Sequence, residues 1–158
     1  MTEEPGEWRQ MPIEWGKIRE YALATGSQHP DYLQNPDAPI PPTFLATVVF
    51  WDEPGRGLRT PEAVAALAEL GEDGDTDIRS ILSAEQEYRF NGPLPRAGER
   101  LWLSHRFDGA EVKEGRRGGR LVFTRFAVEF RDAAGELRAE CLYTSVRTSQ
   151  AATEGARS

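Results

Sequence analysis

The sequence has one cysteine, Cys141, so no internal disulfide can form within the chain. No stretch reaches the roughly 18 consecutive apolar residues that a membrane-spanning helix needs. The first residues, MTEEPGEWRQ, are acidic where a secretory signal would be basic and then apolar. We therefore expect a cytoplasmic protein with no membrane span.

Basic residues are also few, with 19 Lys and Arg against 26 Asp and Glu and a net charge of -7. They form no stripe along a helix or strand, which a protein needs to neutralise a phosphate backbone. We expect no nucleic-acid partner, and likewise no bound metal and no cofactor.

The length of 158 residues predicts one domain, since domains take roughly 100–200 residues each. Residues 1–11 are polar and are expected to form a flexible N-terminal segment. Residues 149–158 contain no large apolar side chain and are expected to form a disordered C-terminal tail. The single folded domain is therefore predicted over residues 12–148.

The N-terminal half has helical patterns separated by a proline-rich segment. Ile18, Tyr21, Ala22 and Thr25 share one face, which predicts a helix over about 13–25 that ends at Gly26. Five prolines between residues 27 and 42 exclude a helix or a central strand there and predict a loop or lid.

Two further helices are expected. The run TFLATVVFW is apolar all round, which favours a buried helix starting after Pro42, with a buried strand as the alternative. Thr60 and Pro61 are an N-cap and a first-turn residue, and they predict a short helix that reaches Leu70 and stops at Gly71.

The C-terminal half has strand patterns. From Ile78 onward the side chains alternate, and strands are also expected at 100–112, 120–131 and 136–148, joined by turns in an antiparallel meander. An apolar helix together with such a sheet suggests an α+β fold in which the sheet covers the helix. The face of the first strand that we expect to be buried carries Leu82, Ala84, Gln86, Tyr88 and Phe90.

Four segments, in this order, carry a family resemblance: GKIREYALATGSQHPDYL, APIPPTF, SAEQEYRFNGPLPRAGERL and GGRLVFTRFAVEFRDAAGELRAECLYTSV. The chain resembles the MaoC-like dehydratase family, in its N-terminal, FAS1-like dehydratase branch. It looks most like the non-catalytic subunits of heterodimeric (3R)-hydroxyacyl-carrier-protein dehydratases. The resemblance implies the hot-dog fold, a curved antiparallel sheet wrapped around one long central helix.

The catalytic motif of the family, G-D-x-N-P-x-H, is degenerate here. The corresponding stretch has Ser27 at the Asp position and Tyr32 at the His position. Neither a hydroxyl nor a phenol with an ordinary pKa near 10 replaces these groups at neutral pH. His29 and Asp31 could form a displaced dyad, or Tyr32 could donate a proton, but a polar surface loop and a space-filling ring explain them without chemistry.

The remaining candidates are substrate-binding residues. In the family, the start of the central helix polarises the thioester carbonyl, which would involve the N–H groups of Thr43, Phe44 and Leu45 here. An ordinary capped helix is the alternative. Gln86, on the face expected to be buried, either has a structural partner or binds the pantetheine arm. His105 and Cys141 are interpreted as core residues.

Three functions stay open. The first is a substrate-binding and structural subunit of a (3R)-hydroxyacyl-thioester dehydratase, paired with a catalytic MaoC-like chain that supplies Asp and His. The second is a non-catalytic homodimer that binds acyl-CoA or acyl-carrier-protein thioesters. The third is a hot-dog thioesterase, in which Asp52 or Glu53 would act. The acyl chain could be fatty, polyketide or a steroid side chain.

The resemblance also implies an oligomer. The strand at 100–107 has apolar side chains on both faces, with Trp102 opposite Leu101, Leu103 and Phe107, so we expect it at an interface.

Overall fold

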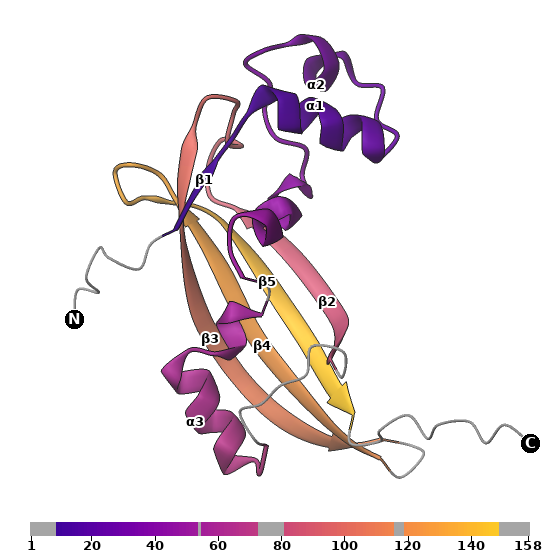
Figure 1. The fold of residues 1–158 in the computed structure, drawn as a ribbon, viewed down its shortest axis with the longest axis vertical. Helices are drawn as coiled ribbons and strands as arrows, with labels where there is room; N and C mark the ends of the chain where they lie inside the picture. Colours follow the sequence, from indigo (N-terminus) through magenta and orange to yellow (C-terminus); the bar gives the residue numbers. More distant parts are fainter. Residues whose placement is uncertain (1–8, 54, 73–80, 116–118, 149–158) are drawn as a thin grey trace, which may run out of the picture. The chain divides into compact units, whose positions relative to one another are not determined.

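The computed structural model describes residues 9–53, 55–72, 81–115 and 119–148. Residues 1–8 and 149–158, which include most of the two predicted flexible ends, lie outside this part. The elements in chain order are β1 (Arg9–Pro12), α1 (Trp15–Ala24), α2 (Pro30–Gln34), η2 (Phe44–Phe50), η3 (Arg56–Leu58), α3 (Pro61–Glu69), β2 (Ile81–Phe90), β3 (Arg100–Glu114), β4 (Arg120–Arg131) and β5 (Leu137–Thr148) (Figure 1).

The strands form one five-stranded sheet in the order β1-β3-β4-β5-β2. The four long strands fall where the alternating pattern placed them, and the bounds of β4 are those predicted. A turn connects β4 to β5, with Asp132 N donating to Glu136 O at 3.0 Å, and between the ends of β3 and β4 Gly115 N donates to Gly119 O at 2.7 Å. The predicted α+β class is confirmed. Of the predicted meander, β3, β4 and β5 follow one another in the sheet, whereas β2 lies beside β5 and not beside β3.

The first strand was not expected. Residues 9–11 lie in the segment predicted to be flexible, yet β1 pairs antiparallel with β3, with Arg9 opposite Leu103 and Pro12 opposite Arg100. Met11 is fully buried. The prediction failed because a four-residue strand holds too few residues to show a period, and its backbone groups are satisfied by a partner far along the chain. With β1 beside it, β3 is not the free edge at 100–103 that an interface strand would need.

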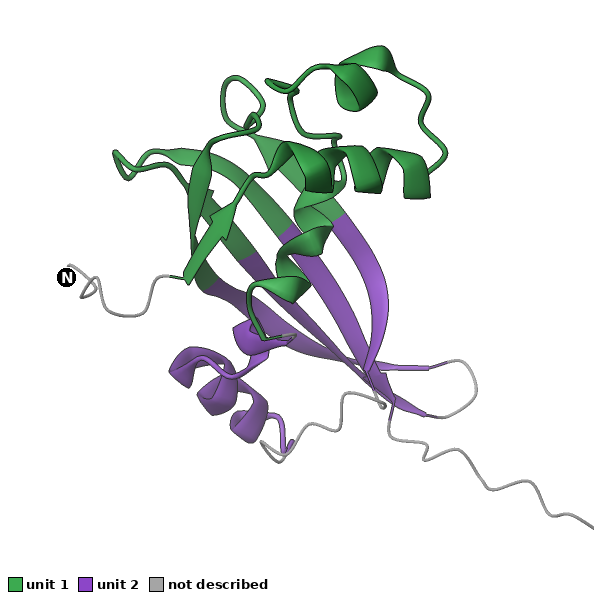
Figure 2. Ribbon diagram, turned by 45° about the horizontal axis from the view of Figure 1, so that its top comes forward, with its two compact units in different colours: residues 1–54, 87–105, 128–141 green, residues 55–86, 106–127, 142–158 purple. Residues whose placement is uncertain are grey.

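The chain divides into two compact units (Figure 2), and β2 to β5 contribute residues to both. Unit 1 comprises residues 1–54, 87–105 and 128–141, and unit 2 comprises residues 55–86, 106–127 and 142–158. Unit 1 buries Met11, Ile13, Ile18, Ala22, Ala38, Ile40, Phe44, Leu45, Val48, Leu101, Leu103, Val128, Phe130, Ala139 and Cys141. Unit 2 buries Leu58, Ala63, Leu67, Val122, Phe126 and Ala127. Each unit therefore has its own apolar core.

The apolar helix is shorter than the family resemblance implied. Where a long central helix was expected, η2 is a 3-10 helix of seven residues, and Val49 and Phe50 at its end are exposed. Phe44, Leu45 and Val48 are buried, so only one side of η2 is covered. The β-branched run Thr47-Val48-Val49 favours helix only weakly, and 3-10 segments are short because their hydrogen-bond geometry is poorer.

The other helices follow their capping signals. In α1, Ile18 and Ala22 are buried as expected, and Gly26 follows the helix with a φ of 77°. The Thr60 side chain caps α3 by accepting from Ala63 N at 3.3 Å.

The proline-rich segment contains α2, a short helix that the prediction excluded. Pro30 occupies its first turn, where a missing N–H costs nothing, so proline starts this helix instead of preventing it.

We expect Gly57→Ala to lower the free energy of unfolding by about 1–3 kcal/mol, through overpacking. A Cβ at Gly57 would clash with the ring of Phe126, within unit 2. Urea denaturation measures the effect. Gly16→Ala in α1 is the control, because nothing lies within 4 Å of its Cβ position, and it should leave stability unchanged or raise it by about 0.5–1 kcal/mol. Equal destabilisation by the two variants would contradict this packing.

Candidate functional site

The degenerate motif lies between α1 and α2, where its side chains make local turn contacts. Ser27 Oγ accepts from His29 N at 3.3 Å, and His29 Nδ1 accepts from Asp31 N at 3.3 Å, which caps α2. The side chains of His29 and Asp31 are exposed. The His29 ring lies 5.4 Å from that of Tyr32. These contacts favour the surface-loop interpretation of His29 and Asp31, because the Nδ1 lone pair that a base would use is already accepting a hydrogen bond.

At the start of η2, a hydroxyl contact holds Thr43 in place. The Tyr21 hydroxyl lies 3.0 Å from the carbonyl oxygen of Thr43 and 2.8 Å from its Oγ1. The Tyr21 ring meets Phe44 edge-on, with 5.5 Å between ring centres, and Phe44 is buried. The structure therefore brings together two predicted binding residues, Thr43 and Phe44, with Tyr21, whose only signal in the sequence was its place on the inward face of α1.

The backbone N–H groups at the start of η2 are less available than they would need to be to polarise a thioester carbonyl, as the family resemblance implied. Phe44 N donates to Pro41 O at 2.9 Å, so this N–H is already paired inside the turn. A 3-10 helix of seven residues also has a smaller dipole than the long helix that was expected. The arrangement favours side-chain hydroxyls over the Phe44 N–H as donors to a ligand.

A second tyrosine adds to this group of residues. Tyr88 is on β2 and half-buried. Burial, and then the proximity of Cys141 and of Tyr21, raise the pKa of Tyr88 far above its ordinary value. Tyr88 is therefore a neutral phenol at physiological pH and can act as a hydrogen-bond donor. Alternation on β2 put Tyr88 on the correct face, but no pattern in the sequence linked it to Cys141.

Gln86 is not the buried amide that was predicted. Its side chain is exposed, and Leu82 on the same predicted inward face is 57% exposed. A period of two shows which residues share a face, but it does not show whether anything covers that face.

A buried charged cluster lies at the other end of η2. The Asp52 carboxylate is 5% exposed, and its Oδ2 lies 2.6 Å from Nε2 of His105. Its Oδ1 accepts from Glu53 N at 2.8 Å and lies 3.1 Å from Arg9 Nε. Both carboxylate oxygens are therefore occupied by donors, which leaves Asp52 poorly suited to act as the nucleophile or base of a thioesterase.

His105 agrees in part with its prediction as a satisfied core histidine. Nε2 is bonded to Asp52, whereas Nδ1 is buried with no hydrogen-bond partner among the described residues. Because the Asp52 carboxylate oxygen can only accept, Nε2 carries the hydrogen of this contact.

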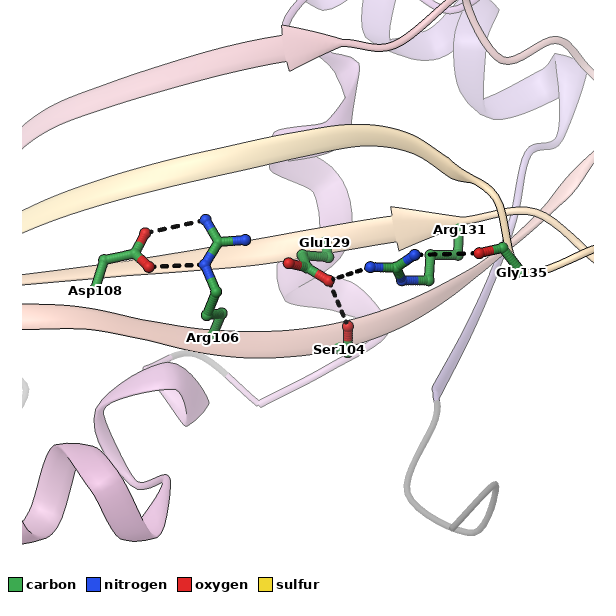
Figure 3. Close-up of polar contacts among 6 residues, drawn as sticks. All are labelled: Ser104, Arg106, Asp108, Glu129, Arg131 and Gly135. Atoms are coloured by element: carbon green, nitrogen blue, oxygen red, sulfur yellow. Dashed lines mark hydrogen bonds and ion pairs between the residues drawn. The ribbon is translucent and has the colours of Figure 1, made fainter. Parts of the chain in front are cut away.

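Figure 3 shows polar contacts of Ser104, Arg106 and Asp108 on β3, which the alternation of a strand places on one face. In unit 1, Glu129 Oε2 lies 3.4 Å from Ser104 Oγ and 2.8 Å from a guanidinium nitrogen of Arg131. In unit 2, Arg106 and Asp108 form a two-point pair at 2.7 and 3.2 Å. The alternation along β3 therefore separates this polar face from the apolar residues Leu101 and Leu103.

Metal and membrane features were also sought in the described ranges. No three His, Cys, Asp or Glu residues there are grouped as a metal ion requires. None of the helices in the same part of the chain is long and apolar enough to cross a bilayer.

The sequence matches the family model described as FAS1-like, dehydratase domain region, over residues 1–140. No curated protein is significantly similar to it. It is similar to the HadBC (3R-hydroxyacyl-ACP dehydratase) complex of Mycobacterium tuberculosis, with 22% identity, a TM-score of 0.54, and coverage of 88% of this chain and 93% of that chain.

Two further solved structures are similar. The ChsH1-ChsH2 complex of M. tuberculosis is 17% identical with a TM-score of 0.61, covering 93% of this chain and 84% of that one. A MaoC-like dehydratase from Phytophthora capsici is 17% identical with a TM-score of 0.62, covering 96% of this chain and 49% of that one. These similarities confirm the predicted hot-dog fold.

We predict that Asp52 and His105 are strongly coupled in stability. His105→Phe removes one hydrogen bond to a buried carboxylate and should lower the free energy of unfolding by about 1.5–3 kcal/mol. Urea denaturation of His105→Phe, Asp52→Asn and the double variant gives the coupling energy between the two residues. Arg106→Ala, in the more exposed pair with Asp108, is the control and should cost less than about 1 kcal/mol. Additive effects of the two single substitutions would show that the contact contributes no coupling.

Proposed function

Because the chain belongs to the FAS1-like dehydratase domain region family, we propose that it is the substrate-binding and structural subunit of a (3R)-hydroxyacyl-thioester dehydratase. In this proposal a second, catalytic hot-dog chain supplies the Asp and His. The thioester is carried by coenzyme A or by an acyl carrier protein, and the enzyme works in the cytoplasm.

The observation that carries the proposal is the pair of residues at the two catalytic positions of the family. Ser27 has no carboxylate, and its hydroxyl accepts from His29 N within the turn. Tyr32 has a phenol in place of the imidazole. The nearby imidazole of His29 caps α2. A chain without an acid-base pair in this loop needs a partner to supply one if the complex is to move protons at C2 and C3 of the acyl group.

The position of β2 at the edge of the sheet supports pairing with a second chain. β2 is at one end of the strand order, and most of its side chains are exposed, including Leu82. An edge strand has unpaired N–H and C=O groups that a strand of a second chain can satisfy. Two of the similar structures are named as complexes of two chains, HadBC and ChsH1-ChsH2.

The same edge suits a second copy of this chain, so a homodimer that binds acyl thioesters without catalysis is the alternative. The thioesterase has less support, because Asp52 is buried with both oxygens in use. Whether a catalytic chain displaces the second copy separates the two leading proposals.

We expect the chain alone not to hydrate a trans-2-enoyl thioester. Each missing acid-base group removes roughly 10²- to 10⁴-fold of rate. The ultraviolet absorbance of the enoyl thioester follows the reaction. Ser27→Asp with Tyr32→His should restore weak activity, and neither single change should. Turnover by the unmodified chain at the rate of a motif-bearing hydratase would refute the proposed division of roles.

We expect the chain not to be a monomer, because β2 offers its open edge to another strand. Light scattering at micromolar concentration should give a mass above the 17.7 kDa of one chain. Leu82→Lys places a charge on an exposed side chain of this edge strand and should weaken association. Val112→Lys, at an exposed site on β3, is the control. A catalytic chain should replace the second copy, and a homodimer that persists beside it would favour the alternative.

A further inference from the structure

One face of the edge strand β2 carries charged side chains. Alternate residues of a strand point to the same face, so Ser83, Glu85, Glu87 and Arg89 share one face of β2. Arg89 contacts Glu87 through two nitrogen–oxygen distances of 2.8 and 3.1 Å, which agrees with a shared face. All four residues are exposed. They form the charged face of β2.

The charge of Glu85 on this face is not offset. Glu87 has its ion pair with Arg89. Glu85, by contrast, makes no ion pair with any residue in the described part of the chain. The charged face therefore has a net negative charge, and it lies on the strand that ends the order β1-β3-β4-β5-β2. A strand that pairs with β2 places its own side chains directly opposite this charge.

A second copy of the chain would set these charges against each other. In a two-fold symmetric dimer that extends the sheet, β2 meets its own copy antiparallel, and opposing side chains point to the same face. The two registers with the longest overlap are centred on Glu85 and on Gln86. The first places Glu85 opposite Glu85, and the second places Glu85 opposite Glu87 twice. Like charges directly opposite each other destabilise a strand pair, and shifting the register further shortens the ladder.

A strand of a different chain is not bound by this symmetry. Its backbone can make the same hydrogen bonds to β2 as a second copy would, so the side chains decide between the two partners. Lys or Arg opposite Glu85 and Glu87 turns each repulsive pair into an attractive one. Each such cross-strand pair is worth roughly 1.4- to 5-fold in affinity.

We propose that β2 pairs antiparallel with a strand of a different chain that presents Lys or Arg opposite Glu85 and Glu87, in preference to β2 of a second copy. This inference rests on the proposed function, because it takes the catalytic hot-dog chain as the different chain. It adds the chemical property by which that chain is selected over the homodimer.

A charge-reversed copy of the chain stands in for the basic partner. Fluorescently labelled unmodified chain is titrated with the unlabelled double variant Glu85→Lys, Glu87→Lys, and sedimentation follows association at about 50 mM NaCl. Each of the two long registers then sets Lys opposite Glu. We expect a dissociation constant roughly three- to thirtyfold lower than with unlabelled unmodified chain. The difference should shrink at about 500 mM NaCl, where exposed charges are screened.

A control variant separates the effect of position from that of net charge. Glu20→Lys with Glu69→Lys makes the same change in net charge at exposed sites of α1 and α3. Its dissociation constant should stay close to that of the unmodified chain. If this control binds as tightly as the double variant of β2, net charge alone explains the result and the inference is wrong.

A milder substitution covers the case in which the double variant does not fold. Glu85→Gln removes the opposing charges without adding new ones, and it should strengthen self-association roughly 1.4- to 5-fold at low salt. Glu20→Gln, which makes the same change in net charge on α1, is its control and should have no effect.

The outcomes separate the inference from the proposed function. Equal affinity of the labelled chain for the double variant and for the unmodified chain would overturn the inference. If Leu82→Lys still weakens association in that case, the pairing through β2 in the proposed function stands. If the labelled chain associates with neither, both the inference and that pairing are wrong.

Discussion

The buried carboxylate of Asp52 is the constraint on which unit 1 depends. A charge removed from water is costly unless each oxygen is paired, so the surrounding segments must present donors to it at the same time. The donors come from Arg9 on β1, from the backbone of Glu53 and from His105 on β3. The C-terminal end of η2 is thereby tied to two neighbouring strands. These contacts fix the position of η2, a seven-residue 3-10 helix that would not be stable alone.

The sequence predicted those parts of the fold that depend on local periodicity. The alternation in β3 to β5, the cap at Thr60 and the glycine after α1 each act within a few residues, so their signals survive in the sequence. The failures involve partners far along the chain. β1 exists because it pairs with residues 88 to 94 positions later, and the place of β2 beside β5 depends on the topology of the sheet. Proline was misjudged at Pro30, where its position within the helix matters more than its presence.

The same division applies to the site. Ser27 and Tyr32 could be identified by comparison with the family motif, and Thr43 and Phe44 by their position at the start of the apolar helix. Both identifications need only the order of residues along the chain. Tyr21 was visible only as a residue on an inward face. The proximity of Tyr88 to Cys141 and the contact of Asp52 with His105 each join residues 53 positions apart. A single sequence contains no information on such pairs until the topology is known.

The open edge of β2 has a consequence for how the protein is made in a cell. Ten residues of edge strand are enough to recruit another strand, whether that strand belongs to the correct partner or not. Charged side chains at Glu85, Glu87 and Arg89 make a flat stack of identical strands less favourable, but they do not remove the backbone groups. In the proposed pairing, a strand of the second chain would cover these groups, so newly synthesised chains would be safest when that chain is produced in matching amounts.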